Sequence, residues 1–139
     1  MALIKSLLAL LLGAFLLSAG TSHLGSNRTE FLAQVPTWLP LDPDFVVIAS
    51  GLVEITLGVL LIITALILKK YRGVIGVITA VFFILIFPGN INQYVNHLDA
   101  FGLDTDTKRF IRLLFQPPLV ALALWCSDGL RLLKKLKQI

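Results

Sequence analysis

Four stretches of the chain are almost entirely apolar, and each is close to the length needed to cross a membrane. They lie at about residues 6–22, 45–68, 73–94 and 110–133. A spanning helix needs about 20 apolar residues, because each residue adds 1.5 Å across roughly 30 Å of hydrocarbon. The stretches lack a two-residue alternation, and lipid-exposed strands would leave backbone groups unpaired. The pattern therefore predicts an all-α protein, a four-transmembrane-helix bundle in one domain over residues 1–139.

The first stretch has a second interpretation. Residues 1–20 carry one lysine, a leucine-rich run and the small residues Ser18, Ala19 and Gly20, which is also the pattern of a cleavable signal peptide. The run is long enough to span, however, and its removal would leave three helices with the two strongly basic ends on opposite sides. We therefore expect an uncleaved helix.

Composition excludes a soluble protein and narrows the chemistry. Hydrophobic residues make up 57% of the chain and charged residues 14%, against about 25% charged in soluble domains. The net charge of +4 comes from basic residues that flank apolar segments, so we expect no nucleic-acid partner. The single cysteine, Cys126, rules out an internal disulfide, and no nucleotide-binding or zinc-protease motif occurs. We expect no metal, because His23, His97 and one carboxylate share no recognisable ligand spacing.

Basic residues concentrate on one predicted side of the membrane. That side carries eight of them: Lys5, Lys69, Lys70, Arg72, Arg131, Lys134, Lys135 and Lys137. The other side carries four basic residues and six acids: Arg28, Lys108, Arg109 and Arg112 with Glu30, Asp42, Asp44, Asp99, Asp104 and Asp106. Because cytoplasmic loops are enriched in Lys and Arg, both termini are predicted to be cytoplasmic in the plasma (inner) membrane. The loops at 23–44 and 95–109 then face outward.

Glu54 is the most informative polar residue of the predicted spans. It lies about nine residues inside the second helix, roughly 13 Å from its outer end. A carboxyl group at this depth faces a bundle interior or a wet cavity, because exposure to lipid is costly. Ser50, Gly51 and Gly58 share its helical face, and small residues there allow a partner helix to approach closely. We expect Glu54 to point into the bundle.

Four further polar residues lie in the outer half of the other predicted helices: His23, Asn90, Arg112 and Gln116. Pro88 would free the carbonyl of Ile84, and the pair at 117 and 118 would free those of residues 113 and 114 unless one of these prolines opens the helix. Irregular backbone at membrane depth is tolerated only beside protein or water. The sequence therefore predicts an outer polar cavity with these residues and Glu54 as ligand-binding or proton-carrying groups.

The same residues also fit a purely structural role. In this alternative Glu54 forms an ion pair with Arg112, and the amides of Asn90 and Gln116 complete the hydrogen bonds. His23 is then an ordinary interfacial histidine.

Amphipathic patterns flank the spans. Phe31, Val35 and Trp38 recur at helical spacing before Pro40, which predicts a short interfacial turn with Trp38 at headgroup depth. In the basic tail, leucines alternate with lysines, which predicts that the fourth helix ends at an anionic leaflet.

Five short stretches resemble the DoxX and DoxX-like family of small four-helix membrane proteins. They are Gly-Thr-Ser-His at 20–23, Val-Pro-Thr-Trp-Leu-Pro at 35–40, Ser-Gly-Leu-Val-Glu at 50–54, Phe-Pro-Gly-Asn-Ile at 87–91 and Arg-Leu-Leu-Phe-Gln at 112–116. Gly89 stands where the family usually has Ala, and Leu114 where Pro is common. The resemblance implies a four-helix bundle in the plasma membrane. Relatives include a subunit of a thiosulfate:quinone oxidoreductase, membrane partners of oxidative-stress enzymes, and animal members that assist receptor assembly, so no single chemistry is implied.

Three functions compete at this point. The leading hypothesis is a redox-linked accessory subunit, not an independent enzyme, that binds a quinone or similar amphipathic ligand and acts with a membrane or periplasmic protein partner. Glu54 would carry a proton, Asn90 and Gln116 would bind the ligand, and Arg112 would balance charge. The alternative is a non-enzymatic assembly or chaperone-like factor for membrane proteins. A third hypothesis, a small-solute or proton pathway, lacks support from any inverted repeat.

Overall fold

The computed structural model describes all 139 residues, and every regular element in it is helical. The elements are α1 (Ala2–Leu24), α2 (Arg28–Gln34), α3 (Pro43–Leu66), the single-turn 3₁₀ helix η1 (Lys69–Tyr71), α4 (Arg72–Val95), α5 (Asp106–Cys126) and α6 (Gly129–Leu136). Four segments are long and apolar enough to cross a membrane: Ala2–Leu24, Pro43–Leu66, Lys69–Val95 and Asp106–Cys126. The predicted all-α architecture with four candidate spans is confirmed.

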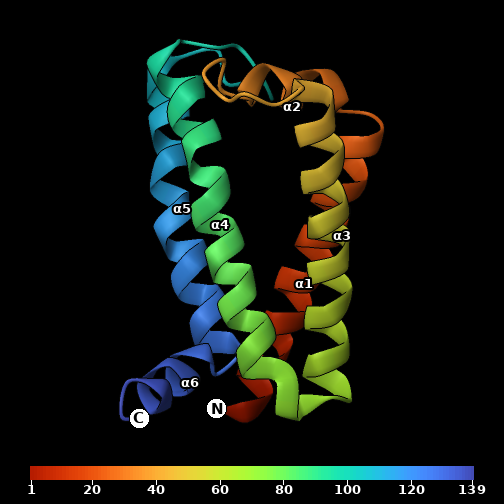
Figure 1. Ribbon diagram of the computed structural model, residues 1–139, viewed down its shortest axis with the longest axis vertical. Helices are drawn as coiled ribbons and strands as arrows, with labels where there is room; N and C mark the ends of the chain where they lie inside the picture. Colours follow the sequence, from red (N-terminus) through yellow and green to blue (C-terminus); the bar gives the residue numbers. More distant parts are fainter.

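The long helices form two pairs. Helix α1 packs along α3, and α4 packs along α5 (Figure 1). The pairs converge at the lower end of the view, where both chain termini lie, and diverge towards the upper end, where α2 crosses between them (Figure 1). The two pairs are therefore closest to each other at the end that carries the termini (Figure 1).

Glycines bring α1 and α3 into close contact. A Cβ atom on Gly20 would lie 2.6 Å from the carbonyl oxygen of Gly51, and one on Gly58 would lie 2.7 Å from the carbonyl oxygen of Gly13. Any side chain at these positions would push the helices apart, since such distances are well below van der Waals contact. The small-residue face predicted around Glu54 is therefore the α1 contact, which fixes the height of α1 relative to α3.

Charged side chains join the two pairs at the converging end. Lys5 of α1 donates a 2.5 Å hydrogen bond to Asp128, just after α5. Arg72 at the start of α4 donates to the carbonyl oxygen of Cys126 and, at 3.2 Å, to the hydroxyl of Ser6. Cys126 itself is fully buried in the apolar core. These contacts satisfy the carbonyl group of Cys126 at the end of α5 and join α1, α4 and α5 to one another.

The fourth segment differs from the prediction. It was expected as one helix at about 110–133, but α5 begins at Asp106 and ends at Cys126, and α6 is a separate helix. The break lies at Asp128, whose φ of 63° is left-handed, a conformation that Asp tolerates better than most residues. Helix α6 then leaves the bundle axis at the lower end (Figure 1). Pro117 and Pro118 lie inside α5, so neither opens a helix.

Candidate functional site

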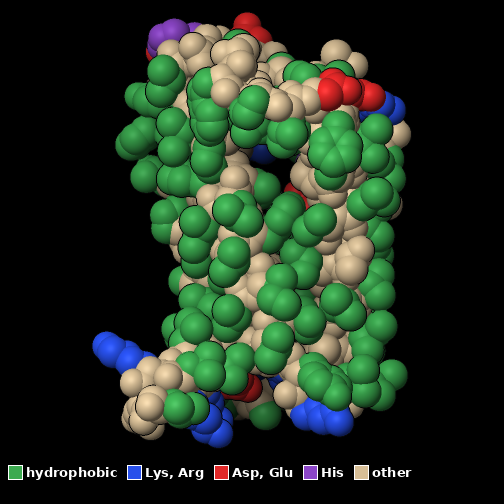
Figure 2. Space-filling view, viewed as in Figure 1, with side chains coloured by type: hydrophobic (Ala, Val, Ile, Leu, Met, Phe, Trp, Pro, Cys, Tyr) green, Lys and Arg blue, Asp and Glu red, His purple; other side chains and the backbone are tan.

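A cavity of about 810 Å³ occupies the space where the helix pairs diverge. Figure 2 shows its mouth as a hollow in the upper half of the molecule, with acidic and basic side-chain atoms visible inside an otherwise apolar surface. Residues of α1 to α5 line it, most of them hydrophobic. All five residues predicted as site residues are among them: His23, Glu54, Asn90, Arg112 and Gln116. The structure thus brings together residues from four separate helices at one end of the bundle.

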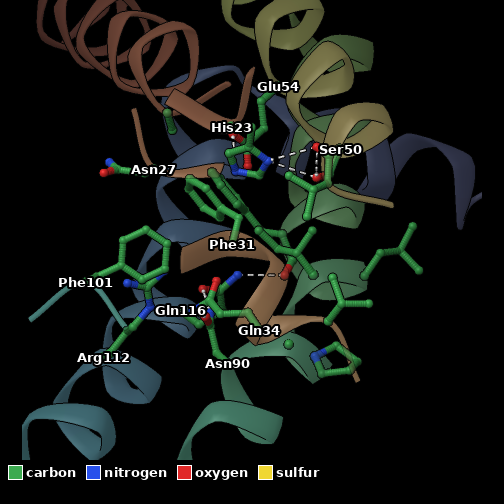
Figure 3. Close-up of a pocket in the computed structure, with 18 of the residues that line it drawn as sticks. His23, Asn27, Phe31, Gln34, Ser50, Glu54, Asn90, Phe101, Arg112 and Gln116 are labelled. Atoms are coloured by element: carbon green, nitrogen blue, oxygen red, sulfur yellow. Dashed lines mark hydrogen bonds and ion pairs between the residues drawn. The ribbon is translucent and has the colours of Figure 1, made fainter. Parts of the chain in front are cut away.

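One wall of the cavity carries an unpartnered carboxyl group. Glu54 is only 5% exposed, and its Oε2 atom has no hydrogen-bond partner. The Nε2 atom of His23 lies 3.4 Å away but outside hydrogen-bonding geometry. The other ring nitrogen of His23, Nδ1, lies 3.2 Å from the carbonyl oxygen of Val47 and 3.0 Å from the hydroxyl of Ser50 (Figure 3). The imidazole is therefore fixed by α3 on one side and faces the carboxyl group on the other.

The opposite wall is a chain of amides. Asn90 of α4 donates a 3.1 Å hydrogen bond to Gln116 of α5, and Gln116 donates at 2.7 Å to the carbonyl oxygen of Phe83. Gln34 of α2 donates to the side chains of Gln93, at 2.6 Å, and Asn90, at 3.5 Å. The network joins α2, α4 and α5, and such satisfied networks hold their members rigidly.

Arg112 is hydrogen-bonded to the amide wall and forms no ion pair with Glu54. Its Nε atom donates a 3.2 Å hydrogen bond to Oδ1 of Asn90, and its guanidinium lies 4.8 Å from the centre of the Phe101 ring (Figure 3). No ion pair within 4.0 Å joins it to Glu54. The ion pair expected under the structural alternative is therefore wrong, although the amides do bond to one another. The ion pair does not form because the arginine and the carboxyl group, although in the same half of the bundle, lie on opposite walls of the cavity.

Helix α2 crosses between the two helix pairs at the diverging end of the bundle, where the cavity lies (Figure 1). Glu30 accepts a 2.5 Å hydrogen bond from the backbone N–H of Phe101, and Arg28 forms an ion pair with Asp44 at the start of α3. The hydrogen bond from Arg28 to Asp44 raises the pKa of the arginine above its ordinary value. Together with the bonds of Gln34, these contacts fasten α2 to both helix pairs.

Several lining residues were not predicted from the sequence, and two of them, Phe31 and Gln34, contact the polar groups described above. Phe31 was expected at the membrane interface with Val35 and Trp38, but its ring stacks on His23 and meets Phe101 edge-on, with 4.6 Å between centroids. Trp38 is 70% exposed, as an interfacial residue would be. Gln34 was not singled out at all. Its only signal was its place one turn after Phe31, on the same inward face.

Comparison with known proteins identifies one family. Residues 12–127 match the model of a family described as a domain of unknown function, DUF8561. This range contains α2 to α5 and most of α1, and with them every cavity residue described above. No curated protein and no solved structure matches the chain.

Proposed function

Since this chain belongs to the DUF8561 family, whose description states no function, we propose a function from the cavity itself. The protein is a multi-pass membrane protein that binds an amphipathic ligand, a quinone or a molecule like it, between its two helix pairs. It serves as an accessory subunit to a redox partner and does not act as an independent enzyme. The resemblance to DoxX-like proteins supports this proposal and suggests that the DUF8561 family is related to them.

The observation that carries the proposal is the composition of the cavity. Its volume of about 810 Å³ lies within the range of small-molecule sites, which are mostly apolar with a few convergent polar groups. Here a mostly apolar lining surrounds one unpartnered carboxyl group, one arginine and one lysine that is paired with Asp104. A buried carboxyl oxygen without a partner is costly. A ligand that hydrogen-bonds to Glu54 would remove that cost.

The distribution of charge supports a location with the cavity on the outer side. The closed end of the bundle carries the basic residues of α6, of η1 and of the α1 start, and basic side chains gather at the lower end of Figure 2. Acidic side chains and histidine gather at the upper end. By the positive-inside rule, both termini are cytoplasmic and the cavity opens towards the outer leaflet of the plasma membrane.

The proposed roles follow from the two walls. Glu54 accepts or donates a proton at a ligand oxygen, and Asn90 and Gln116 orient the ligand by hydrogen bonds. Arg112, held by Asn90 and Phe101, offers its remaining N–H groups to a carbonyl oxygen. In the redox-linked form, the partner protein supplies the electrons, and this chain holds the ligand and delivers the proton.

Native mass spectrometry of gently extracted protein tests this proposal, with the released lipid and quinone identified. We expect a stoichiometric amphipathic ligand whose occupancy falls about tenfold or more in Glu54→Gln, because a hydrogen bond to a charged or buried partner is worth roughly 1.5–3 kcal/mol. Asp42→Asn is the matched control. It removes a carboxylate from the same helix, but Asp42 is exposed, lies outside the cavity, and Asn still caps a helix. Wild-type protein that carries no bound molecule would contradict the proposal.

The outer rim favours one alternative. Trp38, Leu41 and Phe45 are exposed beside one another in sequence at the open end of the bundle. Aromatic side chains on such a surface are typical of protein contacts. In this alternative the chain is a membrane-protein assembly factor, and the same mass spectra would show an empty bundle accompanied by a specific partner.

A further inference from the structure

We infer that Glu54 and His23 hold one proton between them and together form a proton-exchanging pair, suited to a ligand oxygen that switches between carbonyl and hydroxyl. The proton count follows from the contacts of the two side chains and from the charges that line the cavity around them. The assignment of a ligand group rests on the proposed function.

The carbonyl of Val47 fixes which nitrogen of His23 carries hydrogen. A carbonyl oxygen only accepts hydrogen bonds, so the Nδ1 atom 3.2 Å from it must donate. The Ser50 hydroxyl, 3.0 Å from Nδ1, itself donates to the same carbonyl at 3.0 Å, so it too receives from Nδ1. Both neighbours therefore require Nδ1–H. In neutral His23, the lone pair then lies on Nε2, the atom that faces Glu54.

With this tautomer, the protonation state of Glu54 depends on the protonation state of His23. An ionised carboxylate opposite a neutral Nε2 would place two lone pairs 3.4 Å apart in a buried site with nothing between them. One proton removes the conflict, either as a carboxyl O–H directed at Nε2 or as an imidazolium N–H directed at the carboxylate. Either form holds the same number of protons.

The surroundings oppose a second proton. Two cations already line the cavity, both from α5: Arg112, which has no carboxylate partner, and Lys108, which is paired with Asp104. The residues that α2 and α4 contribute carry no charge, and α1 and α3 contribute no other charged group than the pair itself. A protonated Glu54 beside an imidazolium would add a positive charge in a low-dielectric space without a counterion. One shared proton is thus the balanced state.

A pair with one proton can act in both directions. As the redox partner of the proposed function supplies electrons to the ligand, Glu54 or His23 gives its proton to the carbonyl oxygen, which becomes a hydroxyl. As the partner withdraws electrons, the hydroxyl returns the proton to the pair. A purely anionic headgroup would meet the carboxyl group and a purely cationic one would meet Arg112. The site therefore favours a neutral, oxygen-bearing amphipathic molecule.

The chain is well suited to a direct count of these protons. It contains two histidines, at 23 and 97, and two glutamates, at 30 and 54. His97 is exposed with a left-handed φ of 53°, which Asn tolerates, and Gln at position 30 can still accept from the Phe101 N–H. His97→Asn with Glu30→Gln leaves one residue of each kind. Uniform ¹³C-glutamate and ¹⁵N-histidine labelling then reports the pair alone.

Infrared and nitrogen NMR spectra of that double variant in lipid bilayers at neutral pH test the inference. We expect one of two results: a protonated carboxyl band that shifts on ¹³C labelling, with neutral imidazole protonated at Nδ1, or a carboxylate band with imidazolium. A carboxylate beside neutral imidazole, a protonated carboxyl beside imidazolium, or neutral imidazole protonated at Nε2 would each overturn it. In Glu54→Gln on the same background, the glutamate band disappears and His23 is neutral with Nδ1–H, whichever of the two forms the parent shows. Spectra need no added ligand, so this result and the ligand search can fail independently.

Discussion

The contact between α1 and α3 gives the sharpest stability prediction. In Gly20→Ala the new Cβ atom would lie 2.6 Å from the carbonyl oxygen of Gly51 and 2.8 Å from the backbone N of Ile55. Both are helix backbone atoms, which cannot rotate away. Ordinary contact begins near 3.4 Å, so the helices must separate locally by about 0.8 Å.

The magnitude follows from two opposing effects. Overpacking of a tight contact costs typically about 1–3 kcal/mol, whereas Ala in place of a mid-helix Gly gains up to about 1 kcal/mol of helix propensity. We expect a net destabilisation of about 1–2 kcal/mol. The displacement also moves His23, one turn further along α1, away from α3, where it contacts Ser50.

Reversible unfolding in mixed detergent micelles measures this change. Gly73→Ala is the matched control, because Gly73 also lies inside a long helix, α4, and its Cβ would meet nothing closer than 3.5 Å. We expect the control to be at least as stable as the wild type. If Gly20→Ala were as stable as Gly73→Ala, the close approach of the two helices would be refuted.

Three further predictions follow from other contacts. The hydrogen bond from Lys5 lowers the pKa of Asp128. The stability that this bond contributes is therefore complete above the ordinary aspartate pKa and is lost as pH falls through the lowered value. Acid unfolding curves should show this loss in the wild type and not in Asp128→Asn. Gln34→Ala leaves the buried Oε1 atom of Gln93 without a donor and should cost about 1–3 kcal/mol, with faster hydrogen exchange in α2; unchanged exchange would refute the fastening role of this side chain. In a cysteine-free background, Gln138→Cys should react with a membrane-impermeant maleimide only from the cytoplasmic side, and labelling from outside would reverse the proposed orientation.

Depth along the helices was predictable from the sequence. A rise of 1.5 Å per residue fixes height once a span is recognised, so Glu54, Asn90 and Gln116 could be placed in the same half of the bundle before any packing was known. Lateral position was not predictable in this way. Which side chain lies next to Glu54 depends on which helix packs beside α3. The glycine contacts place α1 there.

The remaining differences arise where periodicity gives no signal. Helix α2 has only seven residues, too few to show which face points inward, so Phe31 was assigned to the interface and Gln34 was passed over. The break before α6 depends on the left-handed Asp128, held by Lys5 from the far end of the sequence. A Ser-Asp-Gly turn signal is present there, but the continuing leucine pattern favoured one long helix.

The convergence of the helix pairs makes the cavity a closed well. Its floor includes Leu16 and Phe83, and below them lies the tightly packed core with Leu61 fully buried. In electrical terms this core is an insulator, so most of a membrane potential falls across it and little falls along the solvent-accessible path above. Proton exchange at the bottom of the well would then follow the pH of the side on which it opens and respond only weakly to voltage.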